Sequence, residues 1–301
     1  MQTKRGFILV LALPFALATA GCGTASDSEL SGLRVTVSIV PQKYFVEQIG
    51  GDHVRVNVMV PPGATPATYE PKPSQVRALS DAAIYFAAGV PFESAWLRRL
   101  TGDREALMVV DTSEGIEKII MESHRHHDHH HHAENTLDPH TWLSPGLVKS
   151  HATAICEALC EADPGRSEAY RLNLVSFHAE LENLDRELRA QLENLTSRSF
   201  LVFHPSWGYF ARDYGLKMFP IEVGGQEPSA SELGRLIDRS RDENIRAILV
   251  QPEFSQRSAE IIAREIGVEV ISASPLEEAW AENLRRVAGE LSRVLSDREG
   301  E

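Results

Sequence analysis

The stretch from Leu33 to Gly63, LRVTVSIVPQKYFVEQIGGDHVRVNVMVPPG, decides the fold class. Residues 33–40 and 54–60 are rich in valine, as strands are. Residues 41–51 between them have the pattern of a helix that glycine ends, and a proline–glycine breaker follows the second strand. This alternation of strand and helix patterns predicts α/β layers.

The same alternation extends toward the C-terminus in two blocks. The first block predicts helices and strands in turn at residues 72–82, 83–89, 92–102 and 107–113. The second block resumes it with strands and helices at 199–204, 207–215, 216–223, 229–244, 245–251, 255–267 and 268–273, and with a last amphipathic helix. We therefore expect an α/β fold with two α/β lobes, at residues 33–163 and 198–301.

One long helical pattern separates the two blocks. Between about residues 164 and 197 an apolar residue recurs every three or four positions, as on the buried face of an amphipathic helix. A helix of about 30 residues rises about 45 Å, which is enough to cross both lobes. The sequence thus predicts one backbone helix at 164–197 joining the lobes, with the ligand cleft between them.

The N-terminus has the features of a secretory signal. A basic start precedes an apolar run of about 15 residues, which is too short to span a bilayer. The small residues before Cys22 match the end of a bacterial lipoprotein signal, although Thr19 stands where leucine is usual. We expect residues 1–21 to be removed, Cys22 to carry lipid and residues 22–32 to form a tether. Plain secretory cleavage nearby is the alternative.

The chain is acidic. Its formal net charge is -13, and loss of residues 1–21, which carry two basic residues and no acidic one, makes it more negative still. This balance argues against nucleic acid as a partner and is compatible with cation binding. The sequence contains no phosphate-binding glycine loop, no Gly-x-Ser-x-Gly turn and no His-Glu-x-x-His helix. We therefore expect a binding protein and not an enzyme.

Seven of the twelve histidines lie in one tract within a predicted loop at residues 123–134. A purification tag would lie at a terminus, so a flexible polar loop and a metal site remain as interpretations. Imidazole-rich loops suit Zn²⁺, Ni²⁺ or Cu²⁺. The candidate ligands in this tract are His124, His126, His127, His129, His130, His131 and His132.

Cys156 and Cys160 stand four positions apart in a predicted helix. On a regular helix their Cβ atoms are about 5–6 Å apart, beyond the roughly 3.8 Å that is usual in a disulfide. We expect two packed thiols in preference to a disulfide or a soft-metal site.

Two single histidines stand at positions suited to a ligand. His140 follows an Asp-Pro turn, and His204 ends a predicted strand just before Pro205. Open α/β sheets bind ligands at the carboxyl ends of their strands. A lone histidine is more often a packed or surface residue, so neither position decides the function by itself.

An ordered set of motifs resembles one protein family. After the lipoprotein start and the PPG breaker come YEPKPSQVRALSDA, the His-rich loop, DPHTWLSP, FHPSWGYFARDYGL, EPSASELGRLID and QPEFSQRSAEIIAREIG. Together they resemble the zinc and manganese solute-binding proteins of ABC importers, over nearly the whole mature chain. The resemblance implies two α/β lobes rigidly spanned by one helix and a divalent metal in the cleft. It also implies a membrane permease and a cytoplasmic ATPase as partners.

Carried over to this chain, the family's second and third metal histidines fall on His140 and His204. Its first histidine position is occupied by Ala67, and its acidic fourth position by Ser274. Zinc in proteins normally has three or four protein ligands, and the alanine methyl group supplies none. Two histidines alone would bind the ion weakly.

Other groups are therefore candidates to complete the site. The tract histidines lie eight to sixteen positions before His140, and Glu253 lies in a Gln-Pro-Glu motif where the family usually has Glu-Pro-Gln. We expect Glu70 and Glu222 to make structural hydrogen bonds or to face solvent. Because the His-rich loop resembles those of the zinc members, we expect Zn²⁺. Mn²⁺ or another divalent transition metal is the alternative.

The leading interpretation is a periplasmic or cell-surface lipoprotein, monomeric and anchored through Cys22, that captures Zn²⁺ and delivers it to an ABC importer. Because Ala67 and Ser274 replace expected ligands, the alternative is a divergent lipoprotein that buffers or senses metal, or a receptor for a different ligand. A zinc hydrolase with Glu253 as its base would need an open metal position and a placed general base, which the sequence does not indicate.

Overall fold

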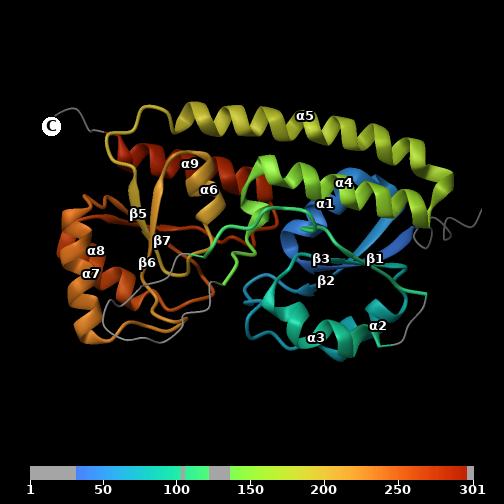
Figure 1. Cartoon of the computed structure of the whole chain (residues 1–301), viewed down its shortest axis with the longest axis horizontal. Coiled ribbons are helices and arrows are strands. Elements are labelled where there is room, and N and C mark those ends of the chain that lie inside the picture. Colours follow the sequence, from blue (N-terminus) through green and yellow to red (C-terminus); the bar gives the residue numbers. More distant parts are fainter. Residues whose placement is uncertain (1–31, 103–105, 122–135, 297–301) are drawn as a thin grey trace, which may run out of the picture. The chain divides into compact units, whose positions relative to one another are not determined.

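Two four-stranded parallel sheets form the framework of the protein (Figure 1). The computed structural model describes residues 32–102, 106–121 and 136–296, and the residues from Gly32 onward belong to one unit. The predicted α/β class, with two lobes and one long joining helix, is confirmed. Within the described ranges no helix is both long and apolar enough to cross a membrane.

The first sheet has the strand order β2-β1-β3-β4, with every pair parallel. Its elements are β1 (Leu33–Ile39), α1 (Val40–Gly50), β2 (Val54–Val60), α2 (Pro73–Ser80), β3 (Ile84–Ala87), α3 (Pro91–Thr101) and β4 (Met108–Asp111). The turn from α1 into β2 requires its glycines. Gly51 has a φ of +53°, and a Cβ on Gly50 would lie 2.3 Å from Cγ1 of Val54.

The second sheet repeats this arrangement with the order β6-β5-β7-β8, again all parallel. Its elements are β5 (Ser199–Val202), α6 (Gly208–Asp213), β6 (Lys217–Pro220), α7 (Ala230–Asp242), β7 (Ala247–Val250), α8 (Arg257–Ile266), β8 (Glu269–Ser272) and α9 (Trp280–Leu295). In both sheets the first and third strands of the lobe lie side by side at the centre. Such central pairs mark the point where doubly wound folds bind ligands.

Helices α4 (Pro145–Ala162) and α5 (Ser167–Gln191) connect the sheets, and the short 3-10 turn η2 (Thr141–Leu143) precedes α4. Helix α5 packs against α1 and α4 in the first lobe and against α9 in the second (Figure 1). The predicted span of 164–197 was too long, because α5 has 25 residues, which rise about 37 Å. A separate 3-10 turn at Pro164–Arg166 precedes it, and the backbone nitrogens of Thr196 and Ser197 bond to Leu295 instead of continuing the helix.

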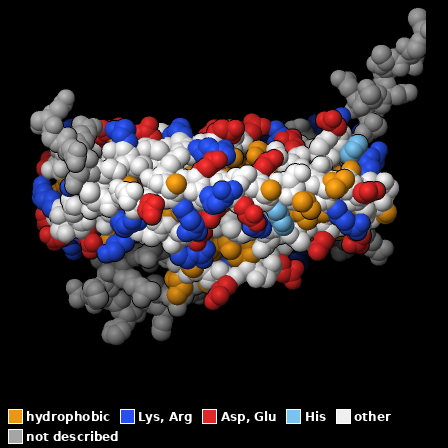
Figure 2. All heavy atoms as spheres, turned by 90° about the horizontal axis from the view of Figure 1, so that it is seen from above, with side chains coloured by type: hydrophobic (Ala, Val, Ile, Leu, Met, Phe, Trp, Pro, Cys, Tyr) orange, Lys and Arg blue, Asp and Glu red, His pale blue; other side chains and the backbone are white. Residues whose placement is uncertain are grey.

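The side of the molecule formed by α5 is solvated and of mixed charge. Figure 2 looks onto this side and shows basic and acidic side chains interspersed, with several hydrophobic side chains among them. Exposed ion pairs occur here at 2.7–2.9 Å, namely Lys149–Glu182, Arg189–Asp185 and Arg285–Glu187. Pairs of this kind contribute little stability, and their alternating signs leave no basic stripe for a nucleic acid on this face.

The two cysteines of α4 are free thiols, as predicted. Their sulfur atoms lie 4.0 Å apart, about twice the length of a disulfide bond. Burial, together with the neighbouring Cys160, raises the pKa of Cys156 to about 12. The Cys156 thiol therefore stays protonated and unreactive near neutral pH.

A buried histidine joins α4 to the carboxyl ends of β3 and β4. His151 is fully buried, with Nδ1 2.8 Å from the Thr112 hydroxyl and Nε2 2.9 Å from the Thr141 hydroxyl. The Thr112 hydroxyl donates to the Ala87 carbonyl at 2.8 Å and accepts from Gln42 Nε2 at 3.1 Å. Since Thr112 has no second hydrogen to donate, His151 Nδ1 donates to it and Nε2 accepts from Thr141.

This arrangement predicts a loss of stability at acid pH. Burial lowers the pKa of His151 to about 4, whereas a histidine in an unfolded chain has a pKa near 6.5. The unfolded chain therefore binds the proton first as the pH falls. The stability contributed by the neutral ring is complete above about pH 6.5 and is lost toward pH 4, to an extent on the order of 3 kcal/mol.

Urea unfolding at pH 7 and at about pH 4.5 measures this effect. The drop in unfolding free energy between the two pH values should be smaller in His151→Gln than in the native protein. The matched control is His178→Gln, since His178 is half-buried and its Nε2 lies 3.2 Å from the Lys149 carbonyl. Equal pH dependence in the native protein and in His151→Gln would contradict the assignment.

Candidate metal site

Segments that follow the strands of both sheets line one cavity of about 330 Å³. The second lobe contributes His204 just after β5 and Gln251 just after β7. The first lobe contributes Ala67 from the loop after β2 and Val90 from the turn after β3. The cavity thus lies where the central strands of both sheets end, which is the usual place for a ligand in such folds.

His140 stands in the cavity wall with its ring fixed by a neighbouring carboxylate. Asp138 Oδ1 accepts from the backbone nitrogen of His140 at 2.9 Å and from its Nδ1 at 2.7 Å. Asp138 is 1% exposed and His140 is 9% exposed. The Asp138 carboxylate therefore holds the His140 ring, and Nε2 of His140 has no hydrogen-bond partner among the described residues.

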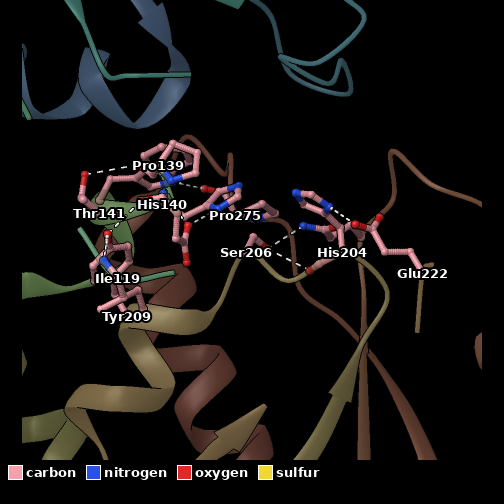
Figure 3. A network of polar contacts seen from close by, with 12 residues as sticks. Ile119, Pro139, His140, Thr141, His204, Ser206, Tyr209, Glu222 and Pro275 are labelled. Atoms are coloured by element: carbon pink, nitrogen blue, oxygen red, sulfur yellow. Dashed lines mark hydrogen bonds and ion pairs between the residues drawn. The ribbon is translucent and has the colours of Figure 1, made fainter. Parts of the chain in front are cut away.

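Hydrogen bonds join the turn that carries His140 to the second lobe. Tyr209 donates to the Asp138 carbonyl at 2.8 Å, and Trp142 Nε1 donates to the Pro275 carbonyl at 2.8 Å. Figure 3 shows these contacts converging on the His140 turn from α6 and from the segment before α9. Gly208 permits the close approach, since a Cβ there would lie 2.7 Å from Asp138 Oδ2.

His204 is oriented in the same way by a different carboxylate. Its Nδ1 lies 2.9 Å from Oε1 of Glu222, which follows β6 and is 8% exposed. In Figure 3 the His204 ring lies between Glu222 on one side and the His140 turn on the other. Glu222 thus makes the structural hydrogen bond that the sequence favoured, and this bond holds a candidate ligand in place.

The two imidazoles have the spacing that one bound ion requires. Their ring centroids are 5.4 Å apart. Two imidazoles that bind one ion tetrahedrally, each at about 2.0–2.1 Å, have centroids roughly 5 Å apart. Because a carboxylate accepts the Nδ1 hydrogen in each ring, the lone pair lies on Nε2. The pair can therefore act as two neutral nitrogen donors to one metal.

Among its described residues, the first lobe brings no further ligand to this pair. Ala67 lines the cavity, as the carried-over position requires, and its neighbours in the wall are Thr65 and Pro66. Glu70 is exposed and does not line the cavity. Across the described part of the chain, no group of three or more His, Cys, Asp or Glu side chains is placed to hold one metal.

Glu253 lies in the cavity wall and is held there by Ser274. The Ser274 hydroxyl donates to Glu253 Oε1 at 2.9 Å and accepts from the backbone nitrogen of Leu276 at 3.2 Å. The serine at the family's acidic position thus bonds to another acid, which lines the cavity. Glu253 remains a candidate ligand through its second oxygen.

The tract candidates, His124, His126, His127, His129, His130, His131 and His132, lie outside the described residues, as does Cys22. The described residues on either side of the tract do reach the cavity. Met121 and Thr136 both line it, and the Met121 nitrogen donates to the Thr136 carbonyl at 2.9 Å. The chain therefore leaves and re-enters the described structure at the cavity wall.

Asp138 and Gln251 escaped the sequence interpretation, and for Glu222 a structural hydrogen bond was predicted without its partner. Asp138 had a local signal, since an acid two positions before a histidine in an Asp-Pro turn can reach back to its ring. Glu222 was considered, but its partner lies 18 positions away and only the fold joins them. Gln251 was visible only as part of an altered motif, and its place in the cavity wall comes from the end of β7.

Comparisons with known proteins agree on one family for this chain. The family model described as the zinc-uptake complex component A, periplasmic, matches residues 35–292. The high-affinity zinc uptake system protein ZnuA of Bacillus subtilis is 30% identical over 290 residues, which cover 92% of this chain and 90% of that protein. The manganese-binding lipoprotein MntA of Halalkalibacterium halodurans is 27% identical over 262 residues, covering 85% and 84%.

Solved structures agree in fold. A crystal structure of ZnuA has 46% sequence identity and a TM-score of 0.81, and the match covers 88% of this chain and 100% of that one. A ZnuA deletion variant with zinc bound has 45% identity and the same TM-score, with 89% and 99% covered. The chain is thus similar to these proteins through both lobes and the joining helix.

Proposed function

This chain belongs to the family of periplasmic zinc-uptake components, and from that membership we propose that it captures Zn²⁺ and delivers it to an ABC importer. At the level of the family, it is a zinc or manganese solute-binding protein that works with a permease and an ATPase, and it is not an enzyme. The choice of zinc and the residues that hold it are the proposal.

One observation carries the assignment of ligands. His140 and His204 face one cavity at a centroid separation of 5.4 Å, and a buried carboxylate fixes each ring through Nδ1. Histidines that bind metals almost always donate their other ring nitrogen in this way. We propose Nε2 of each residue as a metal ligand.

The donor set favours zinc over manganese. Imidazole nitrogens suit Zn²⁺, whereas carboxylate, carbonyl and water oxygens suit Mn²⁺. The described wall offers two imidazoles and one carboxylate, that of Glu253. A zinc-binding solved relative and the zinc-uptake protein of Bacillus subtilis support the same choice.

The missing ligands are proposed to come from two sources. Glu253 already lines the cavity, and one of its oxygens accepts a hydrogen bond from Ser274. The tract residues 124–132 connect to Met121 and Thr136, both in the cavity wall. We propose that one of these sources completes the site and that the remaining tract histidines act as weaker, accessory zinc sites.

Calorimetric titration of the metal-stripped protein with Zn²⁺ tests the function. One tight site per chain is expected, with weaker sites that disappear when residues 124–132 are deleted. His140→Ala should remove the tight site and leave the weak ones. Absence of any tight site in the native protein would defeat the proposal.

A second role has a specific observation in its favour, namely Ala67 and Ser274 at two ligand positions. The chain would then buffer or sense metal through its tract, or hold a different ligand in the cavity. Deletion of residues 124–132 separates the two roles. If it abolished all zinc binding while His204→Ala changed nothing, the buffering role would replace the importer role.

We also propose that the mature protein is a monomeric lipoprotein, periplasmic or on the cell surface, with Cys22 as its first residue. Relatives described as lipoproteins support this. The proposed divisions remain a signal at 1–21, a tether at 22–32 and lobes at 33–163 and 198–301. Cys22→Ala should release the protein from the membrane fraction, as measured by detergent partition; retention there would contradict lipidation.

A further inference from the structure

The cavity is larger than a bare ion needs. Its volume is about 330 Å³, the space of roughly eleven waters at about 30 Å³ each. A four-coordinate zinc held by His140 and His204 needs two further donor atoms. The volume instead lies within the range of about 300–1,000 Å³ in which proteins hold small organic ligands.

The walls of this space are largely apolar. On the first-lobe side they include Ala67, Val90 and Pro91, and on the second-lobe side Phe254 and Leu276. Water packed against such walls lacks hydrogen-bond partners. An organic group that displaces this water gains burial, so the wall that faces the two histidines is suited to carbon atoms as well as to metal-bound water.

The charges around the cavity select the kind of organic group. Asp138 and Glu222 carry negative charge directly behind the two imidazoles, and Glu253 lies in the wall. Among the described residues that line the cavity there is no lysine or arginine. A polyanionic chelator would find no partner here, whereas one that brings amine donors and a single carboxylate is compatible with these acids.

One residue of the cavity wall has a buried polar atom without a partner among the described residues. Gln251 is 3% exposed, and its Oε1 is buried with no hydrogen-bond partner among the described residues. The orientation of the amide follows from its other contact. Gln251 Nε2 donates to Ser206 at 2.8 Å, and the Ser206 hydroxyl is directed at the His204 carbonyl. The free atom is therefore an acceptor, and it requires an N–H or O–H donor.

From these observations we infer that the cargo is a zinc ion already carrying a small aminocarboxylate chelator. His140 and His204 supply two nitrogen donors, and the chelator takes the coordination positions that Glu253 or the tract fills when the ion arrives alone. Its carbon atoms fill the apolar space beside Ala67, and its N–H groups pair with the acceptor of Gln251. The inference rests on the proposed function, since the same two histidines hold the metal.

Equilibrium dialysis of the metal-stripped full-length chain tests the inference. The probes are Zn²⁺ alone, Zn²⁺ with equimolar radiolabelled L-histidine, Zn²⁺ with radiolabelled citrate, and L-histidine without metal. We expect about one histidine retained per chain in the presence of zinc, at least tenfold less without zinc, and at least tenfold less citrate. Zinc is counted in every arm.

Two variants test whether the cavity, and not the tract, retains histidine. The tract is unchanged in both. Ala67→Phe fills the space beside the metal, and it should lower zinc-dependent retention of histidine at least tenfold. Glu70→Gln, in the same loop but outside the cavity, should retain histidine as the native chain does.

In the arm that contains both, zinc retained without histidine would overturn the inference and leave the proposed function standing. Citrate retained as strongly as histidine would also overturn it, as would undiminished histidine retention in Ala67→Phe. No zinc retained in any arm would overturn both the inference and the proposed function.

Discussion

Replacing His204 by alanine is expected to weaken Zn²⁺ binding by well over a hundredfold. Loss of a group that merely orients a metal ligand typically costs about 10–100-fold in affinity, and loss of the ligand itself must cost more. The described cavity offers only one other imidazole, that of His140. Competition with a chromophoric zinc chelator measures the change, and near-ultraviolet circular dichroism checks that the variant is folded.

Glu222→Gln should weaken Zn²⁺ binding less than His204→Ala does. The amide oxygen can still accept the hydrogen of His204 Nδ1, but the negative charge that makes the ring a better donor is lost. We expect a smaller loss of affinity, about 10–100-fold. The control is Glu70→Gln, which alters an exposed acid outside the cavity. A larger loss in Glu222→Gln than in His204→Ala would mean that the carboxylate itself binds the metal.

The second large expected effect is tighter binding of Zn²⁺. Ala67→His is expected to tighten binding of free Zn²⁺ by at least about tenfold, or 1.4 kcal/mol. Ala67 lines the same cavity as His140 and His204, so an imidazole at this position can supply a third nitrogen donor from the first lobe. The same competition assay measures the gain.

Ala67→Phe is the matched control for that gain, because it adds a ring of similar size without a nitrogen donor. It should not tighten zinc binding. If both variants gained equally, filling of the cavity and not coordination would be responsible. If Ala67→His gained nothing, the loop after β2 would not bring position 67 within reach of the other two histidines.

Most of the secondary structure was predictable because it depends on local patterns. The valine-rich strands β1 and β2 and the glycine-ended helix between them lie where their periodicity placed them. The predicted length of α5 was too great because the apolar pattern does not show where the helix ends. Leu192 still faces the core after the helix has ended, while Thr196 and Ser197 bond to the end of α9.

The candidate site was only partly predictable. His140 and His204 were identified through motifs, and Asp138 is close enough in sequence to be inferred as the partner of His140. The partner of His204 is different, since Glu222 follows another strand and reaches the ring only because β5 and β6 are paired. Gln251 and the Ser274–Glu253 contact likewise depend on segments that follow neighbouring strands β7 and β8.

The sequence by itself determined the α/β class, the two lobes, the family, the acidic charge and the two histidines, because each of these depends on composition, periodicity or motifs that are contiguous along the chain. Only the tertiary structure decided that a buried carboxylate holds each histidine and that the His140 turn is hydrogen-bonded to the second lobe. It also decided that the first lobe faces the two histidines with Ala67 and an apolar wall. These features depend on the distance and orientation between residues far apart in sequence. Parallel pairing of β5 with β6 brings Glu222 to His204, whereas hydrogen bonds with Tyr209 and Pro275 hold the His140 turn against the second lobe.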